Sequence, residues 1–314
     1  MNVTIFGAGA IGGHLAARLA RAGATVSAIA RGPHLAALQS RGLTVEAPDW
    51  TATLPIAATD DPATLPPQDI VLVATKAPAL TAVARTIGPL LGPATLVVFA
   101  LNGIPWWYHA GQGDARIPAL DPGGLVWDRI GPQRAIGCVV YSACTVTAPG
   151  TIHVMNAQSR LVLGAPDGTL PPPVLALAAL FRASGVAIDE TDRIRSAIWA
   201  KLVLNLSTGP ICTLGRRPLA ELLPDPALEA AIRATYAEAV SLATAQGYPP
   251  AADLEGFVRR GRTSTHKPSM LQDAELGRPM ETAALLEIPL ALGRMTGTPT
   301  PTLDLFAALL HTQR

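Results

Sequence analysis

The chain has 314 residues, 49% hydrophobic and 15% charged, which excludes an intrinsically disordered protein and suffices for about two domains. Lys and Arg number 24 against 23 for Asp and Glu. A formal net charge of +1 provides neither a basic surface for nucleic acid nor a polybasic membrane patch.

The three cysteines, Cys138, Cys144 and Cys212, lack metal-ligand spacing and are expected to be free thiols in a reducing compartment. The N-terminus lacks signal-peptide features, and proline and glycine interrupt the uncharged stretches. We therefore expect a cytoplasmic protein that binds no metal, nucleic acid or membrane.

The first part of the chain reads as an α/β domain that begins with a β-α-β unit. This unit consists of a strand at 2–6, a glycine-rich turn, a helix over 14–21 and a strand at 25–30. The later elements expected in this part are strands at 70–74, 96–100, 136–146, 151–154, 161–163 and 186–189, and helices over 80–90 and 174–183. The turn at Pro149-Gly150 predicts that some of the later strands are antiparallel.

Beyond about residue 190 the apolar residues recur with helical spacing only. Asp225-Pro226 is a typical helix start, and Gly247 and Gly297 are typical stops. The helices expected here cover 191–206, 226–246, 251–260, 280–296 and 302–310. The predicted fold is therefore an α/β domain over 1–190, followed by an all-helical domain over 191–314.

The segment Gly7-Ala8-Gly9-Ala10-Ile11-Gly12 has the spacing G-x-G-x-x-G and lies between a predicted strand and helix. In this context the motif is typical of dinucleotide binding. Gly7 allows the tight turn, Gly9 lets the backbone approach a pyrophosphate, and Gly12 lets the helix pack on the strand. A glycine turn without a ligand is the alternative. The first domain is thus predicted to be a Rossmann-type dinucleotide-binding domain.

The end of the second strand distinguishes NAD from NADP, because an NAD site places an acidic residue there for the ribose 2′-hydroxyl. Arg31 stands at this point, and the first carboxylate after it is Glu46. A guanidinium suits a 2′-phosphate, so the pattern favours NADP(H). The alternative is that Arg31 is a solvated surface residue.

Polar residues follow the next two strands, at the edge where a parallel sheet opens onto its ligand. Thr75 and Lys76 follow one strand, and a cofactor contact and a solvated lysine are equally compatible with Lys76. Asn102 follows the other strand. Asn102 is a candidate to bind cofactor or substrate, or to cap a helix that begins at Ile104-Pro105.

In the helical domain, Lys201 and Asn205 lie one turn apart on one face of an apolar helix, so Lys201 either lines a cleft or snorkels. Of the 24 basic residues, only Lys76, Lys201 and Lys267 are lysine. A lysine retained in such a chain is enriched where an ammonium must release a proton, although drift explains it equally well. Ser269 lies in a polar break before a predicted short helix, and Glu281 follows the turn after it.

These motifs together resemble the ketopantoate reductase (2-dehydropantoate 2-reductase) family nearly end to end. The resemblance rests on the glycine motif, Arg31, Thr75-Lys76, Asn102-Gly103, the Pro149-Gly150 hairpin, Trp199-x-Lys201-x₃-Asn205 and the block from Lys267-Pro268-Ser269-Met270 to Glu281. It implies an NADPH-dependent reductase of a 2-oxo acid in pantothenate biosynthesis. It further implies that Lys201 is the general acid and that Glu281 supports substrate binding and catalysis. Asn102, Asn205 and Ser269 would then contact substrate or cofactor.

Three departures from the family pattern favour an alternative substrate that is bulkier or less polar. Gly209 stands where the family usually has a second asparagine, residues 282–287 lack the family's polar groups, and Trp106-Trp107-Tyr108 follows Asn102-Gly103. Two alternatives therefore stay open: another NADP-linked hydroxyacid or opine-type dehydrogenase, and a non-catalytic NADP-binding sensor. The sequence contains no signal for the oligomeric state, so a homodimer is also open.

Overall fold

The computed structural model describes residues 1–312, which form two compact units. The first unit comprises residues 1–101 and 106–194, and the second comprises residues 102–105 with the chain from Arg195 onward. The first combines helices and sheets, and every described element after Ile194 is helical. The predicted fold class is confirmed. The sequence does not predict that the short segment 102–105 belongs to the helical unit.

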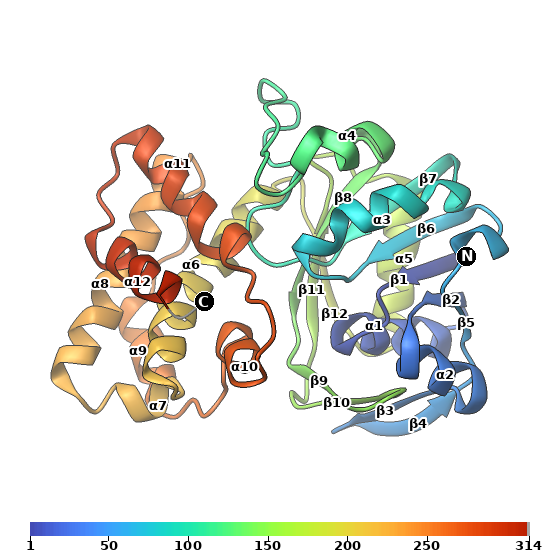
Figure 1. The fold of residues 1–314 in the computed structure, drawn as a ribbon, viewed down its shortest axis with the longest axis horizontal. Coiled ribbons are helices and arrows are strands. Elements are labelled where there is room, and N and C mark those ends of the chain that lie inside the picture. Colours follow the sequence, from blue (N-terminus) through green and yellow to red (C-terminus); the bar gives the residue numbers. More distant parts are fainter. Residues whose placement is uncertain (313–314) are drawn as a thin grey trace. The chain divides into compact units, whose positions relative to one another are not determined.

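An eight-stranded mixed sheet with the order β12-β11-β8-β7-β6-β1-β2-β5 forms the centre of the first unit (Figure 1). The strands from β8 to β5 in this order are parallel, whereas β11 is antiparallel to β8 and β12 is parallel to β11. The strands are β1 (Asn2–Phe6), β2 (Thr25–Ile29), β5 (Ala57–Thr59), β6 (Gln68–Val73), β7 (Leu91–Phe99), β8 (Ala135–Tyr141), β11 (Arg160–Gly164) and β12 (Ala187–Glu190).

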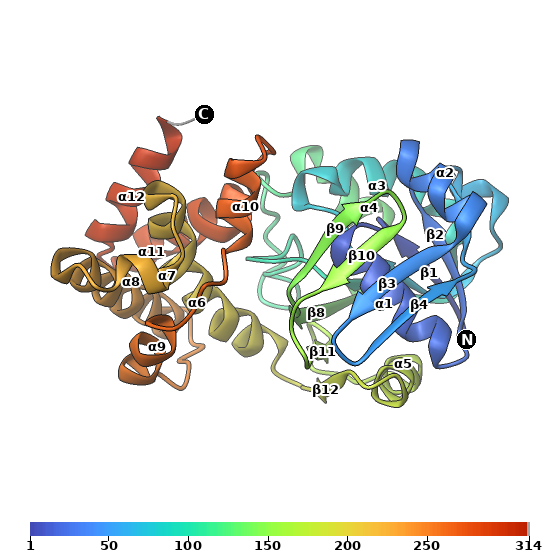
Figure 2. The same cartoon turned by 90° about the horizontal axis from the view of Figure 1, so that it is seen from below.

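The direction in which each connection crosses the sheet decides which face its helix covers. The β1–α1–β2 and β6–α3–β7 connections run in opposite directions from the centre, so right-handed crossovers place α1 and α3 on opposite faces. Helix α5 contacts α1 (Figure 2). The reversal between β1 and β6 is the place where such sheets bind ligands. The helices are α1 (Ala10–Arg21), α2 (Gly32–Arg41), α3 (Leu80–Thr86), α4 (Leu125–Arg129) and α5 (Pro172–Ala183), of which α2 and α4 were not expected.

A second, four-stranded sheet with the order β4-β3-β10-β9 packs against α1 (Figure 2). A Cβ added at Gly13 of α1 would lie 2.9 Å from the side chain of Ile152, so glycine permits this close contact. The strands are β3 (Leu43–Ala47), β4 (Trp50–Leu54), β9 (Cys144–Ala148) and β10 (Thr151–Val154). Neither β3 nor β4 was expected, although both segments alternate apolar with polar residues (Leu-Thr-Val-Glu-Ala and Trp-Thr-Ala-Thr-Leu), so these two strands are missed.

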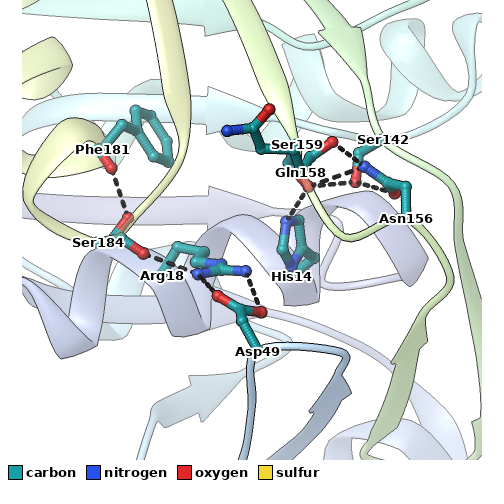
Figure 3. Close-up of polar contacts among 9 residues, drawn as sticks. All are labelled: His14, Arg18, Asp49, Ser142, Asn156, Gln158, Ser159, Phe181 and Ser184. Carbon is teal, nitrogen blue, oxygen red and sulfur yellow. Dashed lines mark hydrogen bonds and ion pairs between the residues drawn. The ribbon is translucent and has the colours of Figure 1, made fainter.

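The expectation of a single strand over 136–146 is wrong. The chain leaves the first sheet after β8 and enters the second sheet as β9. At the crossing, the backbone N–H of Ala143 donates to Asn156 Oδ1 at 2.7 Å. Beside it, Ser142 Oγ lies 2.9 Å from Ser159 Oγ (Figure 3). These side-chain hydrogen bonds replace strand pairing, and apolar periodicity does not reveal them.

The second unit is a set of helices, and its predicted caps are confirmed. Asp225 accepts hydrogen bonds from the N–H groups of Ala227 and Leu228, and Gly247 and Gly297 have positive φ after their helices. The elements are α6 (Ile194–Gly215), α7 (Leu219–Leu222), α8 (Pro226–Ala245), α9 (Leu254–Gly261), α10 (Ser269–Glu275), a π-helical turn η6 (Ala283–Glu287), α11 (Ile288–Thr296) and α12 (Pro301–His311).

Helix α6 was expected to end at Leu206, but it continues through Pro210 to Gly215. The side chains of Ser207 and Leu206 are buried, so packing outweighs the local preference of proline against a helix interior. Within residues 1–312, α6 is the one helix long and apolar enough to cross a membrane, and 56% of its apolar window is buried inside the protein.

A buried polar network fixes α1, whose N-terminus forms the glycine turn (Figure 3). His14 is 0% exposed and its Nε2 lies 3.1 Å from Ser159 Oγ. Arg18, 2% exposed, donates to both carboxylate oxygens of Asp49 at 2.9 and 3.0 Å and to the carbonyl of Ser184 at 2.7 Å. The network therefore ties α1 to the β3–β4 connection, to β11 and to the end of α5.

We predict that His14 makes the protein less stable in mild acid. Burial, and then the charge of Arg18, lowers the pKa of His14 from 6.5 to about 4. Between these values the unfolded chain binds a proton that the folded protein excludes. The free energy of unfolding is therefore highest above the unfolded pKa and falls by about 3 kcal/mol as the pH drops to the folded pKa. Urea unfolding at about pH 7 and about pH 4.5 measures most of this loss, about 2.4 kcal/mol. His14→Gln, which cannot titrate, should lose about 2.4 kcal/mol less between these two pH values. An equal loss in both proteins would contradict the prediction.

Candidate active site and cofactor pocket

A pocket of about 300 Å³ lies in the first unit at the carboxyl ends of β1, β2 and β6. It contains five of the predicted cofactor-binding residues, which are Gly7, Ala8, Gly9, Arg31 and Thr75. None of the twelve lining residues is acidic, so the pocket holds no carboxylate for a ribose 2′-hydroxyl. The other predicted cofactor-binding residues, Ala10, Ile11, Gly12, Lys76 and Asn102, do not line it.

The three glycines of the motif meet different requirements. Gly7 has φ +96°, and a Cβ there would lie 2.6 Å from Thr75 Cγ2. A Cβ at Gly12 would lie 2.1 Å from the Gly7 carbonyl oxygen, so this glycine allows α1 to close on the turn. A Cβ at Gly9 would meet no atom within 4 Å, although Gly9 lines the pocket. Gly7 and Gly12 are therefore needed for the close packing of the turn and α1, whereas the missing side chain at Gly9 leaves space for a ligand.

Two buried polar atoms without a partner belong to residues that line the same pocket. Thr75 Oγ1 and His34 Nε2 are inaccessible to solvent and have no hydrogen-bond partner within residues 1–312. Arg31 is exposed at the start of α2, and its guanidinium makes no hydrogen bond or ion pair within the same residues. Because buried polar groups are normally satisfied, these atoms fit a pocket that binds a polar ligand. The sequence analysis missed His34.

In the second unit, Lys201 of α6 donates from Nζ to Asn102 Oδ1 at 2.6 Å. Both residues are partly buried, and they are 99 positions apart in the chain. The amide oxygen orients the ammonium, and the Asn102 side chain keeps an NH₂ group that can donate elsewhere. The structure thus joins a residue predicted as general acid to one predicted to contact substrate or cofactor.

The turn η6 holds the segment that carries Asn102. The N–H of Ile104 donates to the Ala284 carbonyl at 2.9 Å, and Gly103 has φ +80°. A Cβ at Gly103 would lie 2.3 Å from the same carbonyl oxygen, so glycine is required on both counts. No helix begins at Ile104-Pro105, so the alternative that Asn102 only caps a helix is wrong.

The predicted helix over 280–296 is divided into η6 and α11, with Glu281 just before η6. Pro289 has no N–H to donate to the Leu285 carbonyl, and the wider π-helical turn lies at this point. Glu287 Oε1 accepts a hydrogen bond from Thr282 Oγ1 at 2.8 Å and lies 3.1 Å from His311 Nε2. Glu287 therefore braces the turn, which nothing in the sequence predicts.

The remaining predicted substrate residues lie on two helices of the second unit. Asn205 is partly buried on α6, one turn after Lys201. Ser269 is exposed at the first position of α10. Position 209 of α6 faces Met270 of α10, because a Cβ there would lie 3.7 Å from the methionine Cε. The missing family asparagine is thus replaced by apolar surface.

The aromatic run does not widen a substrate site. Trp106 and Trp107 are 1% exposed and Tyr108 is 2% exposed, and all three lie in the core of the first unit. The Trp106 ring packs edge-on against Phe99 at 5.5 Å and against Trp127 at 5.8 Å. The interpretation of these aromatics as part of a bulky apolar substrate pocket is therefore wrong.

Comparison with known proteins agrees with this arrangement. The family model described as Ketopantoate reductase PanE/ApbA matches residues 3–168, and its C-terminal counterpart matches residues 193–314. A 2-dehydropantoate 2-reductase of Mesorhizobium japonicum is 44% identical over 99% of this chain and 97% of its own length. A solved protein of Ralstonia solanacearum is 39% identical with a TM-score of 0.91, over 99% of this chain and 97% of its own. The 2-dehydropantoate 2-reductase of Geobacter metallireducens is 29% identical with a TM-score of 0.88, over the whole of both chains.

We predict that alanine substitutions separate the two roles of the glycines. Gly12→Ala should lower the free energy of unfolding by about 1–3 kcal/mol, because its Cβ overlaps the Gly7 carbonyl. Gly9→Ala should leave stability unchanged, since its backbone φ of −70° suits alanine, but should weaken dinucleotide binding at least about tenfold. Urea unfolding and NADPH fluorescence titration measure the two effects. Wild-type affinity in Gly9→Ala would mean that no ligand approaches this backbone.

Proposed function

We propose that this chain, which belongs to the ketopantoate reductase family, reduces the carbonyl of a 2-oxo acid with NADPH. The family makes the protein an oxidoreductase acting on a CH–OH or C=O group, which favours an enzyme over the non-catalytic sensor. The single observation that carries the proposed mechanism is the hydrogen bond between Lys201 Nζ and Asn102 Oδ1. It holds an ammonium, the group that can protonate the product oxygen, in a defined orientation.

The first unit would hold the dinucleotide through the residues of its pocket. The backbone at Gly7, Ala8 and Gly9 and the N-terminus of α1 supply N–H groups for the pyrophosphate. Arg31 would bind the 2′-phosphate, and Thr75 Oγ1 offers a further polar contact. The absence of a carboxylate among the lining residues supports NADPH over NADH. When bound, the cofactor supplies a hydride to the carbonyl carbon.

Lys201 would supply the other half of the reduction. As hydride reaches the carbonyl carbon, negative charge develops on the oxygen, which the Lys201 ammonium stabilises and then protonates. The products are a 2-hydroxy acid and the oxidised cofactor, and Lys201 regains its proton from solvent. Asn102 would orient Lys201, Asn205 and Ser269 would hold the substrate by hydrogen bonds, and Glu281 would support substrate binding.

For the cofactor, we predict that Arg31→Ala weakens NADPH binding by about 1.5–3 kcal/mol, the scale of a hydrogen bond to a charged group. NADH lacks the 2′-phosphate, so its affinity should stay near that of the wild type. Arg85→Ala removes an exposed arginine of α3 and controls for the change in net charge. Fluorescence titration with both cofactors measures the effect. Equal losses for the two would show that Arg31 has a structural role only.

For the general acid, we predict that Lys201→Ala lowers kcat by about 10²–10⁴-fold with little change in NADPH affinity. Lys201→Arg should recover little of this loss, because guanidinium keeps the charge but does not release a proton near neutral pH. Lys267→Arg is the matched control, since Lys267 forms an exposed ion pair with Glu275. Full activity of Lys201→Arg would disprove the assignment.

Ketopantoate is the proposed substrate, as the names of the relatives indicate. A less polar 2-oxo acid is the second candidate, because Gly209 leaves an apolar contact with Met270 where the family usually has asparagine. We predict the highest kcat/KM for ketopantoate in a panel of 2-oxo acids monitored by NADPH oxidation. A higher value for an acid without a hydroxyl group would favour the second candidate.

A further inference from the structure

We propose that His34 is a phosphate-binding residue of the dinucleotide pocket and that its Nε2–H is the donor. The proposal rests on the proposed function, namely that this pocket binds a nicotinamide dinucleotide. His34 lies in the first turn of α2, three positions after Arg31, and both residues line the pocket. No motif in the sequence marks His34.

The first observation is that the environment fixes the tautomer of the ring. The backbone N–H of Gly150, in the β9–β10 turn, donates to His34 Nδ1 at 3.1 Å. A nitrogen that accepts a hydrogen bond carries no proton, so the proton of the neutral ring lies on Nε2. The Gly150 turn is itself held in place, since Thr44 donates to the Gly150 carbonyl at 2.8 Å. His34 thus presents a donor at Nε2, and Nε2 has no acceptor role.

The second observation is that this donor is unsatisfied. His34 Nε2 is buried and has no hydrogen-bond partner within residues 1–312. Leaving a buried donor without an acceptor is unfavourable, and such groups in native proteins are commonly satisfied by a ligand or water. Because no oxygen of residues 1–312 accepts this N–H, the acceptor is expected to come from a bound ligand or water.

The third observation is the chemical character of the surroundings. The pocket combines the guanidinium of Arg31, which is unpaired within residues 1–312, with the backbone of the glycine turn, and apart from Thr75 and His34 itself the other lining residues are apolar or glycine. A phosphate oxygen is an acceptor only, so it matches a nitrogen that only donates. A dinucleotide offers two such groups, the pyrophosphate and, in NADPH, the 2′-phosphate. Either can satisfy His34 Nε2, and the two cofactors distinguish them.

The test uses two amide substitutions that divide the functions of the ring. In His34→Asn the side-chain oxygen can take the place of Nδ1 and keep the Gly150 hydrogen bond, but no donor reaches the position of Nε2. In His34→Gln the amide nitrogen can take the place of Nε2, and the acceptor for Gly150 is lost. Dissociation constants for NADPH and NADH, measured by fluorescence titration, are compared with the melting temperature of each variant.

We expect His34→Asn to weaken NADPH binding at least about tenfold at a near-wild-type melting temperature, and His34→Gln to retain most of the affinity at a lower melting temperature. If His34→Asn loses affinity for NADPH alone, the group that accepts from His34 is the 2′-phosphate. If it loses affinity equally for NADH, the accepting group is the pyrophosphate. Wild-type affinity of His34→Asn for both cofactors would overturn the role of His34 and leave the proposed function standing. If the wild type binds neither dinucleotide, the proposed function fails and this inference fails with it.

Discussion

The hydrogen bond from the Ile104 N–H to the Ala284 carbonyl is the constraint on which the candidate catalytic groups depend. It attaches the segment 102–105 to η6, and it thereby places Asn102 within 2.6 Å of Lys201 Nζ. The contact is possible because Gly103 has neither a Cβ nor a preference against positive φ. A change in η6 that moves the Ala284 carbonyl would therefore shift Asn102, the hydrogen-bond partner of Lys201.

The π-helical turn explains why this carbonyl is available. In a regular α-helix the carbonyl of Ala284 would accept the N–H of Ile288 four positions later, but the wider turn releases it to Ile104. Thr282 and His311 both contact Glu287 at the end of the turn and hold its shape. The family's polar residues are absent from 282–287, yet the turn keeps a polar brace of its own.

The sequence predicted those parts of the molecule that depend on local chemistry. The glycine motif located the pocket, and Asp225 located the start of α8, because turns and caps are determined by a few adjacent residues. The strand change at Ser142-Ala143, the docking of segment 102–105 and the role of His34 depend on contacts over 13 to more than 100 positions. Such contacts leave no periodic pattern in a single sequence.

The same limit explains the error over Trp106 and Trp107. Their adjacency to Asn102 in the sequence suggested a shared site, and their burial in the first unit excludes it.

The scarcity of lysine illustrates how composition and geometry answer different questions. Composition singled out three lysines, but it could not separate function from drift. Lys267 pairs with Glu275 at the surface, a role that arginine fills equally well, so its retention indicates nothing about chemistry. Lys201 instead donates to one neutral amide oxygen from a partly buried site. An arginine there would have to accommodate a planar group with five donors, whereas the compact ammonium satisfies the amide oxygen with one of its three protons. Geometry therefore distinguishes Lys201 where composition could not.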